Sequence, residues 1–248
     1  MNTTLIINRY QLSFMRKSLV ILTFVMVGVV LLSLILGLVM QETISFMSLE
    51  ISTAISVFVG GLNSFKECFG FSLQNAASRK NVYLGTLLAG VGTALAFAVM
   101  ESMIFLLTLG AEALAGNLVW ETMVEMLYPL RYAGAGAWKL YAECFLFNAA
   151  VNLAMFMMGF FITTAYYRMN KLWKVIISVG VPVFFVILLP VIFVLTDYRL
   201  MNALADLLVA CFGLSTQNPW CAVGTFTGLA ALMAALTWPL IRRAVIKE

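Results

Sequence analysis

The stretch Ser18–Met40, SLVILTFVMVGVVLLSLILGLVM, decides the fold class. It contains no charged residue and is longer than the ~20 apolar residues with which an α-helix crosses the hydrocarbon core of a bilayer. The whole chain has this character, because 63% of its 248 residues are hydrophobic and only 10% are charged. A soluble domain is about half apolar and a quarter charged. The sequence therefore predicts an all-α integral membrane protein that forms one domain, residues 1–248.

Five further runs with no charge or a single one have the length of a spanning helix. Together with the first they predict six spans, at residues 18–40, 44–65, 82–109, 140–165, 175–195 and 220–241. The second span is the weakest, because Glu50 interrupts it. A seventh apolar run, residues 200–214, is short, which favours a re-entrant or interfacial segment over a span.

The basic residues predict the orientation of these spans, since short cytoplasmic loops collect Lys and Arg. Most of the 15 basic residues fall on one side: Arg9, Arg16, Lys17, Lys66, Arg79, Lys80, Arg168, Lys171, Lys174, Arg242, Arg243 and Lys247. Only Arg131, Lys139 and Arg199 fall on the other side, which carries most of the acidic residues instead. We therefore expect both termini in the cytoplasm.

A basic segment precedes the first span. Ile6, Tyr10 and Phe14 recur there at helical spacing, with Arg9 and Arg16 on the opposite face. This pattern predicts a helix that lies on the inner membrane surface. The alternative is a frayed basic flank that only sets the topology.

The connection between the second and third spans, KECFGFSLQNAASRK at residues 66–80, is too long for a tight turn. Phe69 and Leu73 share one helical face there, which predicts a short amphipathic helix that docks in a groove of a partner or rests on lipid headgroups. We expect Ser78 to cap the third span through its hydroxyl group, with Arg79 and Lys80 at the headgroup level.

Two outer segments also show helical spacing, Val119–Leu130 and Leu200–Cys211. They would either cap a cavity or pack as loop helices on the bundle. Pro182 and Pro190 in the fifth span free backbone carbonyl groups and can kink it.

Three glutamates, Glu50, Glu101 and Glu143, lie inside predicted spans, where a charge costs ~2.5 kcal/mol or more. All three fall in the outer half of the membrane. We interpret them as an acidic outer vestibule for a cationic or amphipathic substrate. Alternatively, they reach to the outer interface or form hydrogen bonds with neighbouring helices.

Small and polar residues form stripes on the spans, and such stripes face other helices or a water-filled path rather than lipid. The stripes are Thr53, Ser56, Gly60 and Asn63 on the second span, Gly85, Ala89, Gly92 and Ala96 on the third, and Asn148, Asn152, Gly159 and Thr163 on the fourth. Glu143 is turned by ~140° from Asn148 at 100° per residue, so it lies outside its stripe. The residues predicted to line a translocation path are Glu50, Ser56, Asn63, Glu101, Glu143, Asn148 and Asn152.

The chain has no His, which excludes imidazole-dependent catalysis and zinc sites of the H-E-x-x-H kind. It also has no phosphate-binding loop motif. We therefore expect no enzyme activity, cofactor or metal in this chain. The net charge of +4 is accounted for by the inner loops and indicates no nucleic-acid partner. Cys211 and Cys221 could form a disulfide, but the sequence does not decide this.

The chain resembles the membrane subunit of a bacterial type-two ATP-binding-cassette exporter. The resemblance lies in the six spans, the basic first segment and the helical loop that ends in Ser78, Arg79 and Lys80 and is followed by Tyr83 and Gly85. The resemblance covers the whole chain in architecture, whereas its motif spans fewer than ten residues.

This resemblance implies a multi-pass subunit in the bacterial cytoplasmic membrane. Its partners would be two copies of an ATPase, which holds ATP and Mg, and a second membrane subunit that forms a dimer with it. The implied substrate is amphipathic or hydrophobic: a peptide such as a toxin or bacteriocin, a lipid or a drug. The residues that would couple to the ATPase are Lys66, Glu67, Phe69, Phe71, Leu73, Gln74, Asn75, Ser78, Arg79 and Lys80.

A secondary transporter, in which Glu50, Glu101 or Glu143 carries protons, is the alternative function. Coupling sites of such carriers usually lie near the midplane, often at broken helices in inverted repeats, and the sequence shows neither feature.

Overall fold

The computed structural model describes residues 3–40, 43–46, 49–74, 77–134 and 136–242. Their secondary structure is almost entirely helical. The long elements are α1 (Thr3–Val39), α2 (Glu50–Gln74), α3 (Arg79–Ala115), α6 (Ala137–Arg168), α7 (Lys171–Val183) and α10 (Pro219–Arg242). The remaining elements are β1 (Ile44–Phe46), β2 (Leu118–Trp120), α4 (Met123–Leu127), α5 (Pro129–Tyr132), the π-helical turn η1 (Phe184–Leu188), α8 (Leu189–Leu195) and α9 (Arg199–Phe212).

Five helical segments of the described chain are long and apolar enough to cross a membrane, which makes this an all-α, multi-pass membrane protein by length and composition. They correspond to five of the six predicted spans. The predicted second span is not among them. Residues 44–46 form strand β1, and helix α2 begins at Glu50. α2 has the length of a span, but polar residues such as Thr53 and Asn63 lower its hydropathy. Six spans and a cytoplasmic position of both termini therefore stay predictions.

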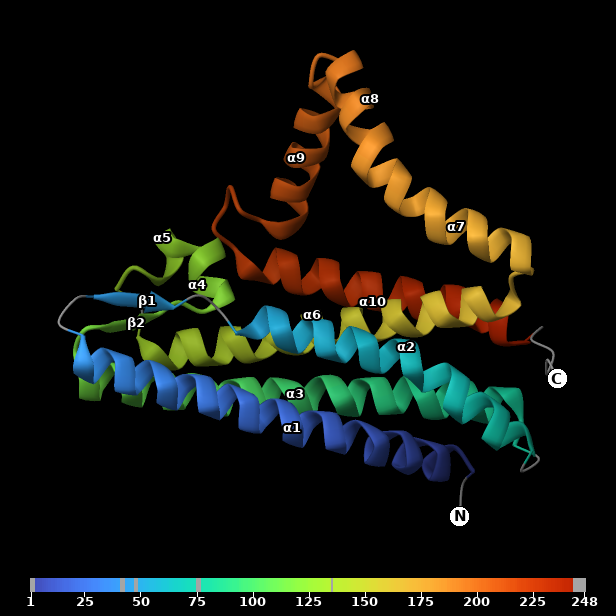
Figure 1. Ribbon diagram of the computed structural model, residues 1–248, viewed down its shortest axis with the longest axis horizontal. Helices are drawn as coiled ribbons and strands as arrows, with labels where there is room; N and C mark the ends of the chain where they lie inside the picture. Colours follow the sequence, from blue (N-terminus) through green and yellow to red (C-terminus); the bar gives the residue numbers. More distant parts are fainter. Residues whose placement is uncertain (1–2, 41–42, 47–48, 75–76, 135, 243–248) are drawn as a thin grey trace.

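Helices α1, α2, α3, α6 and α10 lie side by side in one bundle (Figure 1). α2 packs mainly against α6, which also contacts α10, and α1 packs against α3. The first turn of α1 and the last turn of α10 lie at the same end of this bundle, together with the α6–α7 junction (Figure 1). This end carries Arg79, Arg168, Lys171 and Arg242, and we call it the basic end; the opposite end is called the outer end.

The expected surface helix at the start of the chain does not exist as a separate element, because α1 runs without a break from Thr3 to Val39. No Gly or Pro occurs before Gly28, so nothing in the sequence interrupts the helix. In this first part of α1, Ile7, Gln11 and Met15 are the residues buried within the protein. The predicted apolar face, Ile6, Tyr10 and Phe14, is 42–48% exposed.

Small residues on α3 explain why α1 packs there. A Cβ atom added at Gly85 would lie only 2.8 Å from Ile7 Cγ2, so the two helices approach closely at this point. The buried Gln11 side chain is accommodated by hydrogen bonds from its Nε2 atom to Thr86 Oγ1 at 2.9 Å and to the Ser64 carbonyl oxygen at 3.3 Å. The predicted small-residue seam on the third span is thus an α1–α3 packing surface.

The outer end carries an element that the sequence did not predict. Strands β1 and β2 pair in parallel, with Ile44 opposite Leu118 and Phe46 opposite Trp120. The Phe46 and Trp120 rings stack with their centroids 4.7 Å apart. This pair joins the α1–α2 connection to the segment after α3.

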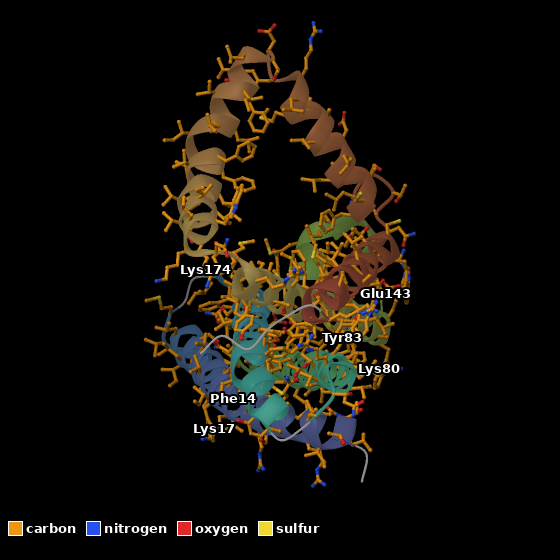
Figure 2. The ribbon with its side chains drawn as sticks, turned by 90° about the vertical axis from the view of Figure 1, so that its right-hand side faces the viewer. Phe14, Lys17, Lys80, Tyr83, Glu143 and Lys174 are labelled. Carbon is orange, nitrogen blue, oxygen red and sulfur yellow. The ribbon has the colours of Figure 1, made fainter. Side chains whose placement is uncertain are left out.

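The predicted fifth span and the segment after it project from the bundle (Figure 1). α7, η1 and α8 lead away from the basic end, and α9 returns to the start of α10 (Figures 1 and 2). These four helical segments contain no buried residue. Pro182 lies inside α7, and the π-helical turn follows it directly, so the expected disturbance of this span is present. Cys211 and Cys221 are free thiols here.

Candidate functional site

The outer half of the bundle contains a cavity of about 50 Å³ between α1, α2 and α3. Segment 120–122, which begins with the last residue of β2, closes one side of it. Its lining residues are Met26, Leu49, Glu50, Thr53, Met100, Glu101, Ile104, Phe105, Thr108, Trp120, Glu121 and Thr122. The space exceeds the ~10–15 Å³ that one water molecule occupies, so it can hold a small polar group.

Glu50, the first residue of α2, is tied to two other elements. Its Oε2 atom accepts a hydrogen bond of 2.6 Å from the backbone N–H of Met123, at the start of α4. Its Oε1 atom accepts one of 2.8 Å from Asn148 Nδ2 on α6. The carboxylate therefore joins α2, α4 and α6 while it lines the cavity.

Glu101 lies on α3 with only 7% of its surface exposed. Its Oε2 atom accepts a hydrogen bond of 3.0 Å from Nδ2 of Asn152, which is also buried. Thr53 on α2 is fully buried and close enough to the Glu101 carboxylate to interact with it. Its hydroxyl oxygen nevertheless makes no hydrogen bond within the described chain.

The structure thus brings together four of the residues predicted to line a path: Glu50, Glu101, Asn148 and Asn152. Helical periodicity placed the two asparagines on one face of the fourth span, and this face is the one that meets the two carboxylates. The role of these residues in transport stays a prediction.

Glu143 does not join this group. Its carboxylate forms a bidentate ion pair with Arg131, from Nε to Oε2 at 2.9 Å and from Nη2 to Oε1 at 2.6 Å. The Tyr132 hydroxyl group donates a further hydrogen bond to Oε2. The three-glutamate vestibule expected from sequence is therefore a two-glutamate arrangement, with Glu143 bound to the segment before α6. Its angular offset from Asn148 had indicated this separation.

The other two predicted path residues lie deeper and apart. Ser56 is within hydrogen-bond distance of Ser18 on α1, with 3.2 Å between the hydroxyl oxygens. Asn63 lines a much smaller cavity toward the basic end, between α1, α2 and α3. The described residues that line this cavity are different from those that line the cavity at Glu50 and Glu101.

The stretch predicted to dock a partner is not a separate helix, because α2 continues through it to Gln74. Phe69 is 2% exposed and stacks on Phe65, with 4.7 Å between ring centroids, so it belongs to the core. The side chains of Lys66, Glu67, Phe71, Leu73 and Gln74, and the whole of Asn75, lie outside the described part of the structure.

The end of this stretch matches the prediction. Ser78 caps α3, because its side-chain oxygen accepts a hydrogen bond of 3.2 Å from the Asn81 N–H. Arg79 Nη1 donates a hydrogen bond of 2.6 Å to the Arg242 carbonyl oxygen at the end of α10. Lys80 is exposed at the same end of the bundle, where it is labelled in Figure 2.

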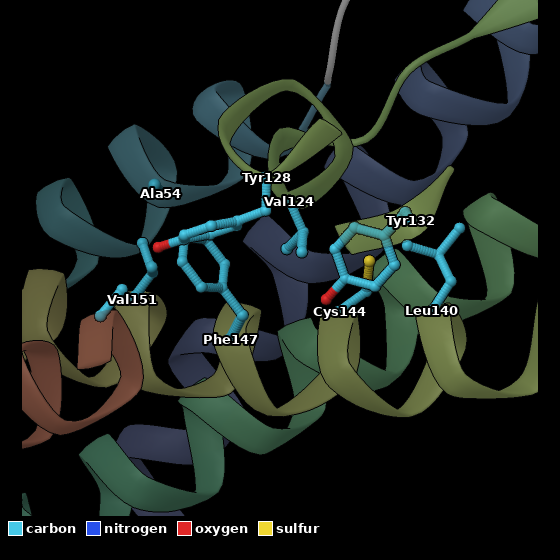
Figure 3. Packing of buried hydrophobic residues seen from close by; sticks show 9 residues of the cluster. Ala54, Val124, Tyr128, Tyr132, Leu140, Cys144, Phe147 and Val151 are labelled. Atoms are coloured by element: carbon cyan, nitrogen blue, oxygen red, sulfur yellow. The ribbon is translucent and has the colours of Figure 1, made fainter. Parts of the chain in front are cut away.

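A cluster of apolar and aromatic side chains fixes α4 and α5, which we call the outer segment (residues 123–132), on α6. Tyr128 and Val124 lie on Phe147 and Val151, and Tyr132 lies beside Cys144 and Leu140 (Figure 3). The Tyr128 hydroxyl group donates a hydrogen bond of 2.6 Å to the Phe212 carbonyl oxygen at the end of α9.

This packing shifts the pKa values of ionisable groups in the outer segment. Burial raises the pKa of the Tyr128 phenol to about 12. It also raises the pKa of Tyr132, and the hydrogen bond to Glu143 adds to that effect. The same carboxylate raises the pKa of Arg131, so this guanidinium group is permanently charged.

Sequence reasoning missed Trp120, Phe105 and Met26 as cavity residues. They come from three elements and share no motif, so only the tertiary fold brings them to one place. Within the described residues, no group of three acidic or Cys side chains converges as metal ligands would.

Compared with known proteins, the chain matches no family model, no curated protein and no solved structure.

Proposed function

We propose that this chain is the membrane subunit of an ATP-driven exporter, and that a separate ATPase docks at its basic end. One observation carries the proposal. The two helices that meet at the connection 75–78, α2 and α3, are also the helices that carry Glu50 and Glu101 at the cavity.

Both helices are continuous between these two points. At 1.5 Å per residue, Gln74 lies ~36 Å along α2 from Glu50, and Arg79 lies ~33 Å along α3 from Glu101. A partner that displaces the connection would therefore move two walls of the cavity as rigid rods. The hydrogen bond from Arg79 to the last turn of α10 extends this movement to a third helix.

In this proposal two ATPase subunits hold ATP and Mg, and the membrane subunit provides the path for an amphipathic or hydrophobic substrate across the bacterial cytoplasmic membrane. A second membrane subunit completes the path. The projecting segment α7–α8 supports such a partner, because none of its side chains is buried by the described chain.

The test is purification of the tagged chain from its native membranes in a mild detergent, with identification of the co-purifying proteins by mass. Replacing residues 66–77 by a flexible linker would remove the buried Phe69, so a substitution at the surface is preferable. Lys80→Glu reverses an exposed charge beside the connection, and Lys139→Glu makes the same change near the outer end as a matched control.

We expect an ATPase in about equal amount with the unmodified chain and with Lys139→Glu, and its loss with Lys80→Glu. Retention of the ATPase by Lys80→Glu would place docking elsewhere. Absence of any ATPase from the unmodified chain would contradict the exporter.

An ion-coupled carrier is the second candidate, because Glu50 and Glu101 line one cavity. In liposomes, such a carrier would move protons without ATP, and Glu101→Gln would abolish the flux. A flux that needs ATP and the partner would exclude this candidate.

A further inference from the structure

We infer that helix α9 pairs antiparallel with α9 of a second copy of this chain, through two reciprocal ion pairs between Arg199 and Asp206. The inference deepens the proposed function, since it rests on that function for the role of a second membrane subunit and names this subunit as a second copy. The contact itself requires no ATPase.

The first reason is a polar stripe without partners in its own chain. Arg199, Asn202 and Asp206 follow one another at i, i+3 and i+7, which places them on one face of α9, and all three are exposed. The two charged residues lie ~10 Å apart along the helix axis, too far to pair with each other. Within the described residues, none of the three side chains forms an ion pair or a hydrogen bond. The stripe is therefore open to another molecule.

The second reason is that this stripe is complementary to itself. When two identical helices run antiparallel, Arg199 of each copy lies opposite Asp206 of the other, so one two-fold axis produces both ion pairs. Asn202 lies close to the midpoint between the two charges and therefore meets Asn202 of the second copy, where side-chain amides can donate and accept hydrogen bonds. Parallel helices in the same register would place like charges together instead. The stripe thus favours a second copy in antiparallel orientation.

The third reason is the position of α9. Its last turn is fixed at the outer end of the bundle, because the Tyr128 hydroxyl group donates a hydrogen bond to the Phe212 carbonyl oxygen and the Thr225 hydroxyl group donates one of 2.7 Å to the Cys211 carbonyl oxygen. From there α9 runs across the direction of the bundle helices (Figure 1). Its 14 residues span ~21 Å, too little to cross a hydrocarbon core of ~30 Å. A two-fold axis along the membrane normal is perpendicular to such a helix, so two copies with the same orientation bring their α9 helices together antiparallel.

The fourth reason is the surface beside the stripe. α7, η1, α8 and α9 contain no buried residue, so this projecting part of each chain offers apolar side chains to a second copy. Exposed ion pairs contribute little to affinity by themselves. Packing of side chains associates helices in a membrane, and the charges across the contact set its register.

The test is oxidative cross-linking of the full chain in its native membranes, with copper phenanthroline and dissolved oxygen as the oxidant. Asn202→Cys is the probe, because this position faces its copy near the two-fold axis. Leu204→Cys is the matched control, since Leu204 is also exposed but lies on the opposite face of α9. Both are made in a chain with Cys211→Ser and Cys221→Ser, which removes the other thiols near the contact.

We expect a covalent dimer with Asn202→Cys and little with Leu204→Cys. Arg199→Asp or Asp206→Arg, each added to the probe, places like charges opposite each other at both ends of the contact and should lower the cross-linked fraction about fivefold or more. The double reversal exchanges the two charges and should restore most of the cross-linking. Lys139→Glu reverses an exposed charge outside α9 and should leave the cross-linked fraction unchanged.

Equal cross-linking of the two cysteine positions, undiminished cross-linking after both single reversals, or no recovery in the double reversal would each overturn the inference. Its failure is distinct from failure of the exporter, because the cross-link needs no ATPase. An exporter whose second membrane subunit is a different protein would keep its ATPase in the co-purification test and give no cross-link between copies of this chain, which overturns only this inference.

Discussion

The crossing of α2 and α6 gives a prediction whose size follows from the structure. A Cβ atom added at Gly159 would lie 2.3 Å from the Phe58 carbonyl oxygen and 2.8 Å from the Leu62 backbone nitrogen. Both atoms belong to the backbone of α2, so no side chain can turn away to make room. Gly159→Ala must therefore separate the two helices, by ~1 Å if the contact is to return to an ordinary distance.

Such a separation weakens the dispersion contacts along the crossing and the hydrogen bond of 2.7 Å from Thr163 Oγ1 to the Leu62 carbonyl oxygen. Overpacking of this kind costs about 1–3 kcal/mol. Gly228→Ala on α10 is the matched control, because a Cβ atom there meets nothing within 4 Å. It should stabilise by ~0.5–1 kcal/mol, since alanine loses less backbone entropy in a helix than glycine.

Thermal unfolding of the purified chain in detergent measures the difference. For a chain of this size, we expect Gly159→Ala to unfold ~3–16 °C below Gly228→Ala. Gly61→Ala meets the Phe156 carbonyl oxygen at 2.3 Å in the same crossing. The double variant should then lose less than the sum of the single losses, because one separation relieves both contacts. Similar midpoints for Gly159→Ala and Gly228→Ala would refute the close crossing.

Two further predictions concern the outer segment. Arg131→Met removes the ion-pair partner of the Glu143 carboxylate, a side chain that is only 23% exposed, and should lower the free energy of unfolding by about 2 kcal/mol. Adding Glu143→Gln to this variant should recover part of the loss in thermal unfolding. Full additivity of the two effects would contradict the ion pair. Tyr128 has a pKa raised to about 12 by burial, so the folded protein holds this proton longer than the unfolded chain. Its contribution to stability is complete below about pH 10 and is lost as the pH rises toward 12. Tyr128→Phe should reduce the dependence of the free energy of unfolding on pH between pH 9 and about pH 12. It also loses the hydrogen bond to Phe212. An unchanged slope would show that the phenol does not titrate in this range.

The sequence predicted the features that depend on neighbours along the chain. Apolar runs located five of the long helices, because a helix that crosses lipid must be apolar over its whole length. Ser78 was recognisable as a cap from its place before the third span, and the structure confirms it. The angle between Glu143 and Asn148 placed Glu143 outside the asparagine stripe of its helix, and in the structure the two residues have different partners, although both were predicted to line one path.

The tertiary structure alone decided where helices end and what lies between them. The periodic patterns before the first span and after the second were real, but a pattern does not show whether a helix bends. α1 and α2 continue straight, and Phe69 is therefore buried against Phe65 rather than presented to a partner.

The cavity also required the tertiary fold. The parallel pairing of β1 with β2 holds Trp120 over α2 and α3, although these two helices separate the strands in the sequence. Glu50 and Glu101 meet because α2 and α3 pack side by side, whereas Arg131 binds Glu143 away from them. The residue composition determines which groups are buried away from water, but only the packing of distant segments decides which of these buried groups face one another.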